Sequence, residues 1–91
     1  MKFQKNYSLS QNYPNPFNPT TLISFGLPKS GNVKLVVYDI LGREAKILVD
    51  EFKQAGSYNI EFDASSLASG VYFYRLESGG YKESKKMLII K

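Results

Sequence analysis

The sequence contains no cysteine, no histidine and no tryptophan. Without cysteine the chain forms no disulfide bond and offers no thiolate to a zinc ion. Without histidine it lacks the commonest general base and the commonest metal ligand. A folded domain of 91 residues with this composition is therefore held together by packing alone.

With no histidine and no cysteine, a general base would have to be a carboxylate or a lysine. The acidic residues are spread over turns and outward strand positions, and no local spacing brings two of them together. Asp39, Asp50 and Asp63 lack the D-x-D-x-D spacing of a calcium loop, which favours turn-forming aspartates over metal ligands. We expect no enzyme activity, no metal and no cofactor.

The formal net charge is +4, but lysines and arginines alternate with acids along most of the chain. The one cluster, Lys82, Lys85 and Lys86, contains Glu83 as well. A nucleic-acid-binding protein is expected to carry a denser basic stripe, so nucleic acid is not an expected partner.

No apolar run approaches the length of about 20 residues that a membrane-spanning helix needs, so no membrane insertion is expected. The first six residues also lack the apolar stretch of a signal peptide. This pattern fits a cytoplasmic protein, and it fits equally a fragment of a longer exported protein. We interpret residues 1–6 as a remnant of a linker or of an expression start, and 7–91 as the domain.

Short runs of β-branched and aromatic residues recur about every ten residues between Gly, Pro, Asn and Ser, which is typical of a β-sandwich. No window shows helical periodicity. The sequence predicts an all-β, immunoglobulin-like sandwich of two antiparallel sheets with about seven strands. The predicted strands are 7–10, 20–27, 33–40, 44–49, 57–63, 71–77 and 82–90.

Alternation along these runs predicts which side chains face the core. Run 33–40 is apolar on both faces, which indicates a central strand. Arg75 and Glu77 share the outward face of run 71–77. The predicted inward sets are Tyr58, Ile60 and Phe62 in one strand, and Tyr72, Tyr74 and Leu76 in another.

The segment between the first two strands carries three prolines, at positions 14, 16 and 19. Proline donates no backbone hydrogen bond and restricts the residue before it to extended geometry. The segment is therefore predicted to be a stiff, extended loop. Asn15 and Asn18 are predicted to close Asx turns on their own backbone.

Four blocks of the chain have a more distinctive sequence than the composition of strands and turns requires, and they occur one after another along the chain. Together they resemble the type A C-terminal sorting domain of the type IX secretion system, found in Bacteroidetes and related bacteria. The resemblance runs from about residue 7 to residue 91. The blocks are NYPNPFNPTT (12–21), VYDILGRE (37–44), LASGVYFYRL (67–76) and KKMLIIK (85–91).

The resemblance implies a function in protein secretion. Domains of this family are joined to a larger cargo protein that passes through the periplasm. The outer-membrane translocon recognises the domain and exports the cargo, and a sortase-like peptidase then removes the domain. The cargo ends as a secreted or cell-surface protein. The domain is thus a substrate and partner of this machinery, with no activity and no cofactor of its own.

By motif match, the resemblance implies that two blocks carry the residues that the translocon recognises. We expect the last strand to leave an edge free for pairing with a partner, and its last three residues to be dispensable for folding. The alternative is an immunoglobulin-like surface binding or adhesion module, since a fold does not determine a function. The candidate recognition residues are Gly70, Tyr72, Arg75, Leu76, Lys86, Leu88, Ile89, Ile90 and Lys91.

Overall fold

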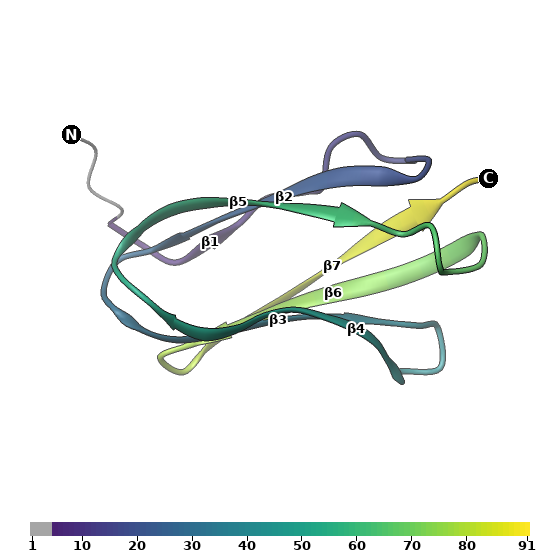
Figure 1. The fold of residues 1–91 in the computed structure, drawn as a ribbon. Helices are drawn as coiled ribbons and strands as arrows, with labels where there is room; N and C mark the ends of the chain where they lie inside the picture. The colour runs from purple at the N-terminus through teal and green to yellow at the C-terminus, as the bar shows by residue number, and fades with distance from the viewer. Residues whose placement is uncertain (1–4) are drawn as a thin grey trace.

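The computed structural model describes residues 5–91, so the predicted remnant 1–6 lies mostly outside the described residues. Residues 5–91 form seven strands and no helix (Figure 1). Within this range there is accordingly no helix long and apolar enough to cross a membrane. The strands are β1 (Ser8–Leu9), β2 (Thr20–Leu27), β3 (Gly31–Tyr38), β4 (Glu44–Lys53), β5 (Gly56–Asp63), β6 (Gly70–Ser78) and β7 (Tyr81–Ile89).

The strands form two antiparallel sheets that pack as two layers (Figure 1). One sheet has the order β1-β2-β5 and the other the order β4-β3-β6-β7. The predicted all-β sandwich is confirmed. The central position predicted for the third strand is also confirmed, because β3 lies between β4 and β6. The side chain of Val36 on the outward face of β3 is only 1% exposed.

Strand boundaries differ from the predicted ones where apolar alternation is a poor guide. β4 continues to Lys53 instead of ending at residue 49, because its backbone goes on pairing with the start of β3, as far as Gly31. Side chains on this edge strand can be charged without burial. β3 ends at Tyr38 because Asp39 begins a turn stabilised by its own carboxylate.

The core lies between the two sheets and is made of aliphatic and aromatic side chains. The inward sets predicted for β5 and β6 do face it: Phe62, Tyr74 and Leu76 are each at most 1% exposed. Tyr58 and Ile60 are half-buried and pack against the core, because β5 is at the edge of its sheet.

The hydroxyl group of Tyr74 joins β6 to the segment that follows β1. It accepts a hydrogen bond from the backbone N–H of Asn12 at 2.8 Å and donates one to the carbonyl of Ser10 at 2.7 Å. The side chain is fully buried. Burial disfavours the ionised phenolate and raises the pKa of Tyr74 to about 12.

Replacing Tyr74 by phenylalanine removes the hydroxyl group and leaves the Asn12 amide and the Ser10 carbonyl without their partner. We expect Tyr74→Phe to lower the free energy of unfolding by about 1–3 kcal/mol, measured by urea denaturation. Tyr13→Phe is the matched control, because the Tyr13 side chain is 80% exposed; its effect should stay within about 0.5 kcal/mol. Equal effects of the two variants would contradict the role assigned to the buried hydroxyl.

The raised pKa of Tyr74 predicts a loss of stability in alkali. The folded-state pKa lies above the ordinary value of 10.0, so its contribution is complete below pH 10 and is lost as pH rises to about 12. Over this range the free energy of unfolding should fall by up to about 1.4 kcal/mol per pH unit because of this residue. Denaturation at several pH values should show a shallower decline in Tyr74→Phe. Parallel declines in the two proteins would reject the assignment.

Candidate functional site

The four sequence blocks converge on one end of the sandwich (Figure 1). The proline-rich loop, the β3–β4 turn, the β5–β6 connection and the end of β7 all lie at this end. The β6–β7 hairpin lies at the opposite end. Segments that are up to 75 residues apart in the sequence are therefore neighbours here.

The proline-rich loop pairs with the last strand through its backbone. The N–H of Phe17 donates to the carbonyl of Leu88 at 3.1 Å, and the N–H of Ile90 donates to the carbonyl of Phe17 at 3.0 Å. These two bonds form a parallel bridge between Phe17 and Ile89, whose side chains are both buried. The loop, which the prolines keep from forming a regular strand, thus holds the end of β7.

Two polar side chains extend this contact along the outer edge of β7. Asn15 Oδ1 accepts a hydrogen bond from the N–H of Leu88 at 3.0 Å, so it pairs with the last strand and not with its own loop as predicted. Gln11 Nε2 donates to the carbonyl of Lys86 at 2.7 Å. The predicted free edge is therefore wrong for residues 86–90. Sequence patterns could not reveal this pairing because its partners are distant in the chain.

The expectation that the last three residues are little committed to the core is wrong for Ile89. Ile89 is fully buried, and it pairs with Gly70 as well as bridging to Phe17. Beyond it, Ile90 is 49% exposed and Lys91 Nζ donates to the carbonyl of Ser65 at 2.8 Å. Of the last three residues, only Ile90 and Lys91 lie outside the core.

The β3–β4 turn is organised by the carboxylate of Asp39. One oxygen accepts hydrogen bonds from the N–H groups of Leu41 and Arg43 at 2.9 and 3.0 Å, and the other accepts from Arg43 Nε at 2.8 Å. The backbone N–H of Arg43 contributes most to lowering the pKa of Asp39. Gly42 supplies the positive φ of 82° that the turn needs. Ile40 and Leu41 are left exposed at the tip.

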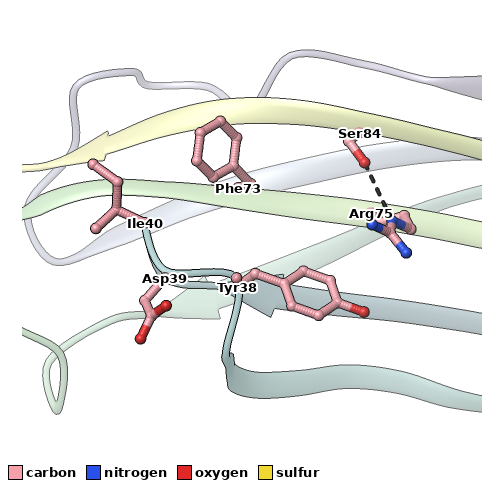
Figure 2. A pocket seen from close by; sticks show the side chains of 7 residues that line it. Tyr38, Asp39, Ile40, Phe73, Arg75 and Ser84 are labelled. Carbon is pink, nitrogen blue, oxygen red and sulfur yellow. Dashed lines mark hydrogen bonds between the residues drawn. The ribbon is translucent and has the colours of Figure 1, made fainter.

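A pocket of about 260 Å³ opens beside this turn, on the outward face of the four-stranded sheet (Figure 2). The guanidinium carbon of Arg75 lies 5.2 Å from the centroid of the Tyr38 ring, and Arg75 Nε donates to Ser84 Oγ at 3.4 Å. The residues that line the pocket are Tyr38, Asp39, Ile40, Gly42, Phe73, Arg75 and Ser84.

The candidate recognition residues divide into an exposed set and a buried set. Leu76 and Ile89 are fully buried and Tyr72 is 8% exposed, so these side chains offer a partner little or no surface while the domain is folded. Gly70 opens β6 with a positive φ of 148°, and Leu88 is half-buried. The exposed members are Arg75, Lys86, Ile90 and Lys91.

Sequence reasoning did not single out Tyr38, Phe73 and Ser84, which line the pocket around Arg75. Alternation places Phe73 on the same face as Arg75, because the two residues are two positions apart in one strand. Tyr38 and Ser84 belong to other strands. Their position beside Arg75 depends on the strand order, and no sequence pattern indicates that order.

Comparison with known protein families matched residues 11–91 to the family model described as a secretion system C-terminal sorting domain. The chain belongs to this family. Neither the curated proteins nor the solved structures yielded a match. The predicted resemblance is therefore confirmed, and it supports a C-terminal sorting signal of type IX secretion. Such a signal implies export, ending in a secreted or cell-surface location, and the family is not a catalytic one.

The matched region of the sorting domain begins at Gln11, whose side chain donates a hydrogen bond to the carbonyl of Lys86 on β7. It ends at Lys91, which holds the β5–β6 connection. The family match thus includes both sides of the contact between the proline-rich loop and the last strand.

The Asn15 side chain is expected to protect the end of β7. We expect Asn15→Ala to speed hydrogen exchange at the Leu88 amide and to cost about 0.5–1.5 kcal/mol of stability, the net value of one hydrogen bond. Asn18→Ala is the matched control, because Asn18 lies in the same loop and its side chain makes no hydrogen bond within residues 5–91. Unchanged exchange at Leu88 in Asn15→Ala would show that the bond does not hold the strand.

Proposed function

We propose that this domain directs a cargo protein from the periplasm through the outer membrane by the type IX translocon. A sortase-like peptidase then cleaves the domain from the cargo. The domain acts as a substrate of this machinery and contributes no catalysis. Its partners are the translocon, the peptidase and the cargo to which it is covalently joined.

The observation that carries this proposal is the meeting of the four family blocks at one end of the sandwich. The 12–21 and 85–91 blocks pair through the Phe17–Ile89 bridge. The 37–44 and 67–76 blocks line the pocket around Arg75. A signal assembled in this way exists only in the folded domain, which explains how a recognition surface can be made of segments so distant in sequence.

The exposed residues Arg75, Lys86, Ile90 and Lys91 are the ones that we propose contact the translocon. The buried residues Tyr72, Leu76 and Ile89 act indirectly in this proposal, because they hold β6 and β7 in the core. Gly70 pairs with Ile89 and Leu88 pairs with Val71, so both residues take part in the pairing that sets the register of β6 and β7. Substitutions in the buried set should therefore reduce export only in proportion to lost folding.

Delivery of a reporter tests the function directly. Residues 7–91 are fused to the C-terminus of a periplasmic reporter in a bacterium with this secretion system, and surface-exposed and released reporter is measured. We expect delivery in the normal strain, none in a translocon-deficient strain, and released reporter lacking the domain by mass spectrometry. Delivery that does not depend on the translocon would reject the proposal.

Removal of the last two residues separates recognition from folding. Ile90 and Lys91 lie outside the core, so their deletion removes the hydrogen bonds to Phe17 and Ser65, at about 0.5–1.5 kcal/mol each, but no buried side chain, while export of the fused reporter should be lost. Deleting residue 89 as well removes a buried side chain, which typically costs about 2–5 kcal/mol. Thermal unfolding of each variant provides the control. Normal export by the two-residue truncation would reject a role for these residues in recognition.

A further inference from the structure

The outward face of the four-stranded sheet is organised in rows that cross the strands. One row contains Lys34, Glu77 and Lys82, which are paired side by side on β3, β6 and β7. Asp50 on β4 lies opposite Lys34 and completes the alternation of charge. Opposite charges on neighbouring strands attract one another, so the alternation of this row is favourable. The ion pair of Glu77 runs to Arg75 in the next row.

The next row along the strands contains Arg75 as its single charge. Its neighbours are Val36 on β3 and Ser84 on β7, and Ile47 on β4 lies beyond Val36. Val36 is 1% exposed although it faces outward, so the Arg75 stem and the Ile47 side chain flank a covered apolar position. No acidic residue lies in this row to pair with the guanidinium.

The contacts of Arg75 leave most of its donors unused. Nε donates to Ser84 Oγ at 3.4 Å, and Nη1 lies 3.7 Å from a carboxylate oxygen of Glu77, too far for a hydrogen bond. Among the described residues, the N–H groups on both terminal nitrogens have no acceptor. These groups form the planar fork that binds a carboxylate in a bidentate manner. The Tyr38 ring beneath the guanidinium orients this fork.

The third row places aromatic rings beside a second free cation. Tyr38, Phe73 and Lys86 are adjacent on β3, β6 and β7. Within residues 5–91 the Lys86 ammonium has no ion pair. Ile40, 69% exposed, adds an aliphatic wall at the β3–β4 turn (Figure 2). The pocket thus combines an apolar floor with the Arg75 guanidinium, whose ion pair to Glu77 is long and partly exposed, and Lys86 lies beside the pocket on β7.

The volume of about 260 Å³ is below the range of about 300–1,000 Å³ typical of small-molecule sites. It suits one or two side chains of a protein segment. Charge complementarity with Arg75 and Lys86 requires an acidic side chain, and Phe73 and Ile40 require an apolar one.

We propose that this pocket binds an extended segment of a partner protein in which a carboxylate side chain lies beside an aromatic or aliphatic one. The carboxylate binds the guanidinium fork of Arg75, and the apolar side chain packs on Phe73 and Ile40. The inference rests on the proposed function, in which the partner is a component of the secretion machinery. It names the chemistry by which that partner is recognised.

A titration of the chain with blocked dipeptides tests the ligand chemistry without the secretion system. The probes are N-acetyl-glutamyl-phenylalanine amide and its glutaminyl analogue, followed by ¹H–¹⁵N spectra of residues 1–91. We expect shifts centred on residues 38, 73, 75 and 84, with a Kd of about 1 mM for the glutamyl peptide. The glutaminyl peptide should bind about tenfold more weakly, the value of one charge-assisted bidentate pair.

Three variants assign the binding to the Arg75 fork. Arg75→Gln should weaken binding of the glutamyl peptide about tenfold. Arg75→Lys keeps the charge and the stem that covers Val36, and it should lose nearly as much because the fork is gone. Lys82→Gln removes a cation from the same face outside the pocket and should leave the affinity unchanged. Dispersed spectra and melting temperatures show that each variant is folded.

The outcomes are distinct. Absence of peptide binding, or binding unaffected by both Arg75 variants, overturns the inference. Arg75-dependent binding to phosphatidylglycerol vesicles without peptide binding would assign the surface to lipid and also overturn it.

The reporter fusion supplies the second readout: export should fall in both Arg75 variants and not in Lys82→Gln. Peptide binding with normal export in the Arg75 variants would overturn the role in sorting. Failure of the unmodified domain to direct export rejects the proposed function alone, since the titration still decides the ligand.

Discussion

The backbone bridge between Phe17 and Ile89 is the contact on which the functional end of the molecule depends. A last strand at a sheet edge would ordinarily present unpaired N–H and C=O groups. Here the proline-rich loop occupies those groups near the end of β7. The loop connects β1 and β2 of one sheet, whereas β7 belongs to the other sheet. The bridge therefore also closes one side of the sandwich.

This closure divides the last strand into parts with different roles. Ile89 is a core residue, whereas Ile90 and Lys91 lie outside the core but keep a backbone or side-chain tether. A terminal signal held in this way has a defined orientation before any partner arrives. Preorganisation of this kind lowers the entropic cost of binding. In the stretch of β7 from Lys82 to Ser84, which the loop does not cover, Lys82 lies opposite Glu77 and Glu83 forms an ion pair with Lys85.

The outward face of the four-stranded sheet shows a similar division between structure and recognition. Its alternating row of Lys34, Glu77 and Lys82 resembles the usual surface of a soluble sandwich. The pocket around Arg75 departs from it, because most of the guanidinium donors are unused and Phe73 is exposed beside them. Exposed apolar groups rimmed by polar residues often mark an interaction site. The domain thus presents two neighbouring features at one end, a tethered terminus and a cationic, aromatic pocket.

The sequence by itself determined the fold class, most strand positions and the inward faces of β5 and β6, because alternation has a period of two residues and needs no knowledge of partners. It also revealed the family, through four ordered blocks. Tertiary structure alone decided what those blocks do together. The pairing of Asn15 with Leu88, the burial of Ile89 and the position of Tyr38 under Arg75 all join residues distant in the chain. Such contacts follow from strand order and sheet packing, and local sequence patterns carry no record of either.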